Sequence, residues 1–253
     1  MPEMRPGITW IPDMRTNGRT LSHRRAGRIT AAIFMVPFSL LLSAGEPEDK
    51  LESVLNRMEK ASRNLQSFVA DITTTKYTAI LGQFDHPEKG KFYYRRAGNG
   101  SALIRLEILD PAVRILTIQD DEAVSYQPKI NSARKYKLGK DKDKAEYLAL
   151  GIAQSPTNLK STFHITYRGR ENVNGTACSV LDLKPKNPRA SAMFSAITVW
   201  IKDSTGVSTG MKLEEPFGDY VLVTFTNEQL NRRIDDSTFR QILPDNVDML
   251  QIN

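Results

Sequence analysis

The side chains that most often do chemistry in proteins are scarce in this chain. Its 253 residues include one cysteine and three histidines. Cys178 cannot form an internal disulfide, and the apolar run around it predicts a buried, unreactive thiol. His86 falls in an expected turn and His164 in an expected strand, as ordinary surface histidines do. We therefore expect no metal site and no cofactor.

Sequence motifs of enzymes are also scarce. The chain contains no HExxH, CxxC or P-loop sequence. Acidic residues cluster at Glu214-Glu215 and at Asp120-Asp121-Glu122, but neighbouring side chains of a strand point to opposite faces. Such residues cannot converge on one substrate, so we interpret them as solvated. We expect no catalytic residues and no enzymatic activity.

The excess of positive charge is concentrated at the N-terminus. Residues 1–45 hold six arginines and two acids, which account for +4 of the chain's formal net charge of +6. The rest of the chain, with 29 basic and 27 acidic side chains, is close to neutral. A basic balance of this origin does not indicate nucleic-acid binding, so we expect no nucleic-acid partner.

Residues 1–45 have the layout of a secretory signal peptide. Arginines precede the uncharged segment 29–45, which ends in small residues. The apolar run is shorter than the roughly 20 residues that a membrane-spanning helix needs. We expect residues 1–45 to be removed, and residues 46–253 to form a single exported domain in the periplasm.

Alternatives stay open for this leader. It could remain as an uncleaved anchor, although Pro37 interrupts the apolar run. Arg24-Arg25 could mark a twin-arginine signal, although apolar residues do not follow the pair directly. The true start could be Met14. No cysteine follows the small residues, so we expect that the protein is not itself lipidated.

The clearest helix is predicted over residues 48–66. Its apolar residues recur on one face, with charged residues opposite, which is typical of an amphipathic helix. Such a helix covers either an apolar core or an apolar ligand cavity, and the pattern fits both. The apolar face consists of Leu51, Val54, Leu55, Met58, Ala61 and Leu65.

Beyond this helix the sequence predicts antiparallel strands. Apolar and polar residues alternate along short segments, which turn sequences such as Asn174-Gly175 separate. Roughly ten or eleven strands are expected. They include residues 68–80, 91–96, 103–109, 113–119, 123–126, 163–168, 177–183, 197–202, 211–215 and 220–226.

Two other segments interrupt the strands. The basic stretch 135–144 also contains Asp141 and Asp143, so we interpret it as a solvated loop, with a docking role as the alternative. Residues 145–153 are mostly apolar and predict a short helix that Ser155 and Pro156 end.

A sheet this large has to close on itself or cover one face. We predict a mainly β fold with some α: an unclosed, strongly curved antiparallel β-barrel whose helices cover an apolar cavity. The helices and the alternating apolar side chains of the strands supply the predicted lining. It consists of Leu51, Val54, Leu55, Met58, Phe68, Ala70, Ile72, Phe92, Tyr94, Leu106, Ile108, Tyr147, Leu148 and Ile152.

Arg96 follows Phe92 and Tyr94 on the same face of one expected strand. If the two aromatic residues face the interior, Arg96 faces it too, where a buried guanidinium needs a partner. The alternative is that Arg96 lies past the strand end in solvent.

Several short segments share the pattern of one family. Ser67–Asp71 is similar to an S-F-x-A strand, and Gly90–Arg96 resembles a G-x-L-x-x-K-R-P segment. Asp120–Pro128 resembles D-G-K-x-x-W-x-Y-x-P, and Leu243–Val247 resembles L-P-x-G-V. In this order, over nearly all of residues 46–253, they resemble the LolA-type periplasmic lipoprotein carriers. Residues 200–227 are similar to a sub-branch of lipoprotein-sorting proteins.

This resemblance implies an unclosed β-barrel with a helical lid over an apolar cavity. It implies that the protein takes acylated lipoproteins from an inner-membrane ABC transporter and delivers them to the outer membrane, with or without an acceptor there. A strand-end arginine of the family holds the lid closed, a role that falls to Arg96. Ala97 stands in place of the family's Pro, so the role could instead fall to Arg95. We expect a monomer.

Other functions fit parts of the pattern. A periplasmic sensor or regulator, or a lipid-binding protein, could share the fold. A regulator of this kind usually carries a further domain, for which we expect no room after Leu243-Pro244. An enzyme that acts on envelope lipids would need a nucleophile and a base, and the sequence shows no plausible pair of them. We therefore predict a lipoprotein carrier.

Overall fold

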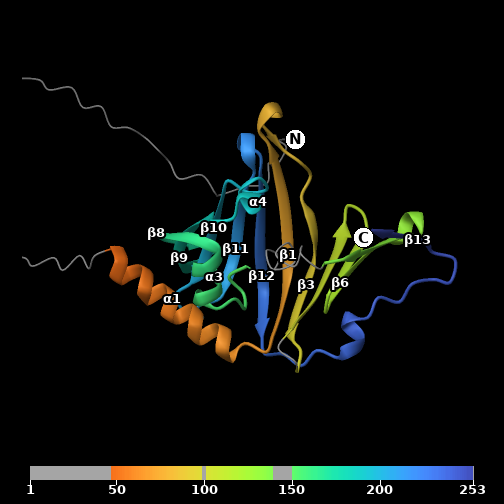
Figure 1. Ribbon diagram of the computed structural model, residues 1–253, viewed down its shortest axis with the longest axis horizontal. Helices are drawn as coiled ribbons and strands as arrows, with labels where there is room; N and C mark the ends of the chain where they lie inside the picture. Colours follow the sequence, from red (N-terminus) through yellow and green to blue (C-terminus); the bar gives the residue numbers. More distant parts are fainter. Residues whose placement is uncertain (1–46, 99–100, 139–149, 253) are drawn as a thin grey trace, which may run out of the picture. The chain divides into compact units, whose positions relative to one another are not determined.

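A long amphipathic helix opens the part of the chain that the structure, a computed structural model, describes: residues 47–98, 101–138 and 150–252 (Figure 1). Helix α1 spans Pro47–Asn64, close to the predicted 48–66. The predicted leader lies outside the described residues and stays a prediction. Among the residues described, no helix is long and apolar enough to cross a membrane.

Helix α1 packs through the face that its apolar spacing creates. Val54, Leu55 and Met58 are buried, whereas Asn56 and Lys60 on the opposite face are exposed. This division follows from the period of 3.6 residues, which brings every third or fourth residue to the same side. The helix therefore serves as a cover with one apolar surface.

The strands form a single 13-stranded sheet. Its order is β13-β7-β6-β5-β4-β3-β1-β12-β11-β10-β9-β8, and β2 pairs with β1 beside this path. The strands are β1 (Ser67–Thr78), β2 (Gln83–Phe84), β3 (Glu88–Arg96), β4 (Ala102–Asp110), β5 (Arg114–Gln119), β6 (Glu122–Gln127), β7 (Ser132–Lys137), β8 (Phe163–Val173), β9 (Thr176–Pro185), β10 (Ala196–Lys202), β11 (Ser208–Glu214), β12 (Tyr220–Leu230) and β13 (Asp248–Ile252).

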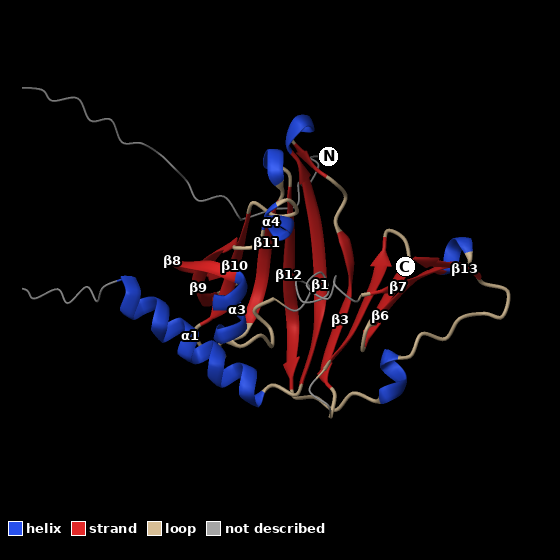
Figure 2. Cartoon of the chain, viewed as in Figure 1, coloured by secondary structure: helices blue, strands red, loops and turns tan. Residues whose placement is uncertain are grey.

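The sheet is curved and does not close. Within the described ranges, β8 and β13 each pair with one strand, so each is an edge. The pairings are antiparallel except that of β13 with β7, which is parallel. Figure 2 shows α1 with the shorter helix α3 (Pro156–Thr162) beside the β8–β9 end of the sheet. The predicted unclosed, curved, mainly β fold is confirmed, with more strands than expected.

The prediction of a loop over residues 135–144 is wrong for residues 135–137, which form the end of β7. Lys135 belongs to β7, where its Nζ lies 2.9 Å from Glu122 Oε1 on the neighbouring β6. Ala133 and Lys135 lie two positions apart and share one face of β7; Ala133 is fully buried, whereas Lys135 is partly exposed and its ammonium is paired with Glu122. Residues 139–144 lie outside the described residues.

The short helix predicted over residues 145–153 is not found in its described part. Residues 150–153 form a turn, and Gly151 has φ +72°, a left-handed conformation that ends helices. Ser155 and Pro156 start a helix instead of ending one: Ser155 Oγ accepts a hydrogen bond of 3.3 Å from the Asn158 amide, capping α3.

Shorter elements complete the described chain. These are the helix α4 (Pro188–Ser191) and the 3-10 helices η1 (Ala79–Leu81), η2 (Pro128–Ile130), η4 (Pro216–Gly218) and η5 (Asp236–Phe239). Helices η1 and η4 meet at one end of the sheet, where the Ala79 amide donates to Asp219 Oδ1 at 2.8 Å.

The two faces of the sheet are covered differently. The inner face, on which α1 lies, carries the main apolar cluster. On the outer face, Val69 and Leu103 pack against Ile234 and Phe239 of the segment that follows β12. This segment, residues 231–247, crosses the outer face before β13 joins the edge strand β7. The inner face is therefore the one whose apolar side chains a helix covers.

Candidate functional site under helix α1

Aromatic rings form the centre of the inner face. Phe68 of β1 is fully buried, and its ring centroid lies 6.1 Å from that of Phe92 and 5.5 Å from that of Phe225. The rings meet edge to face or tilted, the arrangements that aromatic pairs favour. Leu55 and Met58 of α1 belong to the same apolar cluster, so the helix packs on the face of the sheet that carries these rings.

Most of the residues predicted to line a cavity meet in this cluster. Leu51 and Leu106 are partly buried against it, and Ile108 is buried outside it. Tyr147 and Leu148 lie outside the described residues. The predicted residues inside the cluster are Val54, Leu55, Met58, Phe68, Ala70, Ile72, Phe92, Tyr94 and Ile152. Their role in ligand binding stays a prediction.

The prediction missed the contribution of the second half of the sheet. Strands β9 to β12 line the inner face as extensively as β1 and β3 do. The alternation of residues 196–202, AITVWIK, was the signal that could have placed β10 there. The residues that β9 to β12 add to the cluster are Leu181, Leu183, Ile197, Val199, Ile201, Met211, Val223 and Phe225.

Arg96 connects the sheet to the C-terminal turn of α1. Its Nη2 donates to the Ser62 carbonyl oxygen at 2.5 Å, and its backbone amide donates to the Gln66 carbonyl at 2.8 Å. The last carbonyls of a helix lack partners within the helix and carry its negative dipole end, so a guanidinium is a favourable partner. Arg96 thus anchors the helix, and the alternative that it lies free in solvent is wrong.

Arg95 points to the other face of the sheet. It donates to the Ile234 carbonyl at 2.8 Å and to Asp236 at 2.5 Å, and its guanidinium stacks over the Phe239 ring at 5.2 Å from the centroid. These contacts hold the segment after β12 on the outer face. Of the two adjacent arginines, Arg96 is therefore the one that bonds to α1.

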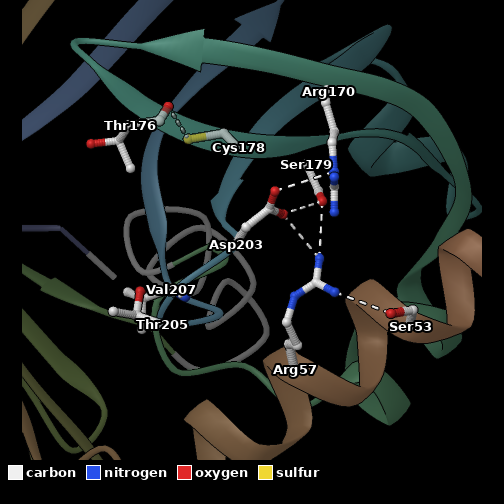
Figure 3. Close-up of polar contacts among 9 residues, drawn as sticks. All are labelled: Ser53, Arg57, Arg170, Thr176, Cys178, Ser179, Asp203, Thr205 and Val207. Carbon is white, nitrogen blue, oxygen red and sulfur yellow. Dashed lines mark hydrogen bonds and ion pairs between the residues drawn. The ribbon is translucent and has the colours of Figure 1, made fainter.

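A second polar anchor holds the middle of α1 (Figure 3). Arg57 Nη2 donates to Ser179 Oγ at 3.0 Å and to Asp203 Oδ1 at 3.1 Å, while Ser179 Oγ donates to Asp203 at 2.6 Å. Arg170 Nε lies 3.2 Å from the other carboxylate oxygen of Asp203. A charged pair that is partly buried and shares a hydroxyl is stronger than an exposed surface pair.

The turn that carries Asp203 approaches α1 closely. Gly206, with φ +73°, leaves no room for a side chain, because a Cβ there would lie 2.5 Å from the Arg57 carbonyl oxygen. The close approach places Asp203 within reach of the Arg57 guanidinium. Helix α1 is therefore fixed to the sheet by apolar packing along its face and by polar contacts of Arg57 and Arg96.

Cys178 lies next to this network on β9. It is buried, and its Sγ lies 3.5 Å from the Thr176 carbonyl oxygen (Figure 3). Burial raises the pKa of the thiol to about 11, and the negative charge of Asp203 acts in the same direction. The predicted burial of this cysteine is confirmed.

We expect Cys178 to resist alkylation in the folded protein. The thiolate is the reactive form, and a pKa raised from 9.0 to about 11 makes it about a hundredfold scarcer at pH 8. Iodoacetamide labelling, followed by mass spectrometry, should be far slower for the folded protein than for the protein in guanidinium chloride, and should speed up as pH rises from 9 toward 11. Equal rates at pH 8 would contradict the buried, neutral thiol.

A pattern that is typical of hydrolases was overlooked in the sequence. In the structure, its serine does not have the position that this motif requires. Residues 206–210 read G-V-S-T-G, which matches G-x-S-x-G. Ser208 is fully buried at the start of β11, and its hydroxyl bonds to the Gly210 carbonyl at 2.9 Å instead of standing on a strand-to-helix elbow. His86 and His164 are exposed and far along the chain from it.

The chain matches known proteins at the level of family and fold. The family model described as outer membrane lipoprotein carrier protein LolA matches residues 63–241. A search of curated proteins finds no match. Among solved structures, an uncharacterized conserved protein from Thermus thermophilus is 12% identical with a TM-score of 0.52, over 80% of this chain and 99% of that chain.

Two further solved structures have lower TM-scores. A chain of the MucA/MucB complex of Pseudomonas aeruginosa is 18% identical with a TM-score of 0.45, over 76% of this chain and 61% of that chain. A LolA superfamily protein from Nitrosomonas europaea is 11% identical with a TM-score of 0.34, over 75% and 97% of the two chains. At 12% identity, the Thermus thermophilus structure supports the fold alone.

The matched region of the family model contains the elements of the candidate site. It includes the end of α1 and every strand from β1 to β12. It also includes both strand-end arginines and the aromatic residues of the inner face. Because the match extends over more than half of the sequence, the chain belongs to the outer membrane lipoprotein carrier protein LolA family.

Proposed function

We propose that the protein binds the acyl chains of lipoproteins under α1 and carries them through the periplasm from the inner to the outer membrane. The observation that carries this proposal is the construction of the cover. An amphipathic helix lies over an aromatic and aliphatic sheet face, and beyond that packing it is held by polar contacts of Arg57 and Arg96. Such a cover can separate from the sheet while the sheet stays folded.

The physics of the cargo requires a cover of this kind. Each buried CH₂ group of a lipid chain contributes about 0.8 kcal/mol, so an acylated protein does not leave a membrane for water unaided. When α1 moves away, the cluster around Phe68 and Leu55 opens into an apolar cavity, and acyl chains replace the helix contacts. Return of the helix to Arg96 then favours release.

The proposal includes a location and partners. The leader over residues 1–45 exports the chain, so the carrier works in the periplasm. An inner-membrane lipoprotein-releasing ABC transporter loads it, and the outer membrane, with or without an acceptor protein, unloads it. The carrier acts as a monomer, and binding and release need no catalytic residues.

A release assay tests this function. The protein, residues 46–253, is added to spheroplasts of the source organism, and the soluble fraction is probed for lipoproteins. We expect release of lipoproteins in a stable complex with the protein, and loss of release in Leu55→Asp, because a charge at this buried position opposes apolar contacts. The matched control is Asn56→Asp, which places the same charge on the exposed side of α1.

Folding has to be checked beside release. Circular dichroism shows whether Leu55→Asp keeps its sheet, and Leu51→Asp, at a partly buried position nearer the start of α1, gives a milder version of the same test. If the unchanged protein releases no lipoprotein and the purified material contains free lipid, the carrier function is wrong. The protein would then be a lipid-binding protein or a sensor of the same fold.

A further inference from the structure

An open basin lined by arginines lies where α1 meets the ends of β1 and β3. Its volume is about 600 Å³. Arg95 and Arg96 come from the end of β3, and Arg232 and Arg233 come from the segment after β12. We call this depression the arginine basin. Asp235 and Asp236 also line it, so its six charged side chains sum to a net charge of +2.

The backbone that presents Arg232 and Arg233 is fixed. The Gln66 amide donates to Asn231 Oδ1 at 2.8 Å, and the Asn231 amide donates to the Ser67 carbonyl at 2.9 Å. Ser67 Oγ donates to the Arg232 carbonyl at 2.5 Å, and the nearby Ile234 side chain is buried. The backbone of Arg232 and Arg233 beside the basin is therefore ordered, and both exposed side chains start from fixed positions.

The contacts of the four arginines leave donors for a ligand. Arg95 is occupied by the Ile234 carbonyl and by Asp236. Arg232 donates one Nη1 contact to Gln229 at 2.9 Å, and the Arg233 side chain is 95% exposed with Asp235 at 4.0 Å. A guanidinium has five N–H donors, so most donors of Arg232 and Arg233 face solvent.

We propose that the arginine basin binds a phosphate group. Guanidinium groups stay charged at all physiological pH values and match phosphate oxygens with paired, parallel hydrogen bonds. A net charge of +2 suits a phosphate monoester or diester, and a basin of about 600 Å³ admits a headgroup as well as a bare phosphate ion. The phosphate can come from a lipid headgroup or from a small soluble phosphate.

Phosphate in the basin competes with the anchor of α1. Arg96 lines the basin and also donates to the Ser62 carbonyl of the helix, so one guanidinium serves both partners. A phosphate oxygen carries negative charge in a monoester and in a diester, so it attracts the guanidinium more strongly than a neutral carbonyl does. Binding therefore loosens the last turn of α1. This coupling rests on the proposed function, in which α1 moves, whereas phosphate binding itself does not.

Titration of the protein with inorganic phosphate tests the site. The protein is produced by export of the full chain, and calorimetric binding of phosphate is compared with chloride at equal ionic strength. We expect saturable binding of phosphate that weakens about tenfold or more in the double variant Arg232→Gln/Arg233→Gln. The matched control is Arg168→Gln. It removes an exposed arginine of the edge strand β8 that pairs with Asp182 of β9. Equal weakening in both variants, or no saturable binding, overturns the site.

Vesicles distinguish the two sources of phosphate. Stronger binding to phosphatidylglycerol vesicles than to phosphatidylcholine vesicles, lost in the double variant, assigns the basin to an anionic lipid headgroup. Binding of inorganic phosphate without this preference assigns it to a small soluble phosphate. Both outcomes support a phosphate site, and their joint absence overturns it.

Amide hydrogen exchange tests the coupling. Phosphate should speed exchange in the last turn of α1, residues 60–64, and leave the β8–β9 amides unchanged. Unchanged or slower exchange there overturns the coupling while binding is measured separately. Neither result depends on lipoprotein release, so failure of this inference and failure of the carrier function are told apart.

Discussion

Phe68→Ala is expected to lower the free energy of unfolding by about 3–5 kcal/mol, the usual cost of removing a fully buried phenylalanine side chain. Phe68 is 0% exposed and touches both Phe92 and Phe225 edge to face. Its loss leaves a void beside Phe92 and Phe225 that rigid strands cannot fill. Thermal denaturation should show a midpoint lower by roughly 10 °C or more.

Phe217→Ala is the matched control for this substitution. The Phe217 side chain is 101% exposed on η4, so its removal takes away no packing. We expect a change in the free energy of unfolding within about 0.5 kcal/mol, as for other surface positions. A loss for Phe68→Ala as small as this would show that the inner face is not tightly packed around its aromatic rings.

The strands that the sequence predicted best are those with regular alternation. Buried side chains alternate along β3 and β10, whereas Ser67–Ala70 of β1 are all buried because Val69 packs on the covered outer face. The turn at Asn174-Gly175 fixed the hairpin of β8 and β9, although both strands run further than expected. Local periodicity therefore predicted where strands exist better than where they end.

Elements that depend on distant partners were missed. β13 has no alternation of its own and forms because Asp248–Ile252 pairs in parallel with β7. β7 was not predicted because its charged residues, such as Arg134 and Lys135, are typical of a solvated loop. α3 was missed because Ser155 and Pro156 fit both the end of one helix and the start of the next.

In the candidate site too, some contacts could be predicted from the sequence and others could not. Arg96 could be singled out because Phe92 and Tyr94 share its strand face, and its partner Ser62 comes from the predicted helix. The Arg57–Asp203 pair could not be predicted, because it joins residues 146 positions apart through a turn whose path depends on the whole sheet. Sequence periodicity predicts which residues share one face of a helix or strand. Only the folded chain brings two such faces into contact.

Arg96→Leu is expected to raise the affinity for an acyl chain by about tenfold. The bond from Arg96 to the Ser62 carbonyl stabilises the closed position of α1, and a hydrogen bond from a charged group contributes about 1.5–3 kcal/mol. Because binding requires α1 to move, loss of this bond removes a cost of binding. A fluorescent fatty acid titrated into the protein measures the change, and transfer to acceptor vesicles should slow correspondingly.

Arg95→Leu separates this effect from a general loss of arginine. Arg95 is the next residue on the same strand, but it bonds to Ile234 and Asp236 on the outer face. We expect this variant to lose stability while its affinity for the fatty acid stays within about twofold of the unchanged protein, since its contacts lie away from α1. Equal gains in affinity for both variants would mean that loosening of the whole sheet, and not release of α1, controls binding. A loss of affinity in Arg96→Leu would mean that the arginine contacts the ligand itself, and the anchor would then have to be sought at Arg57 and Asp203.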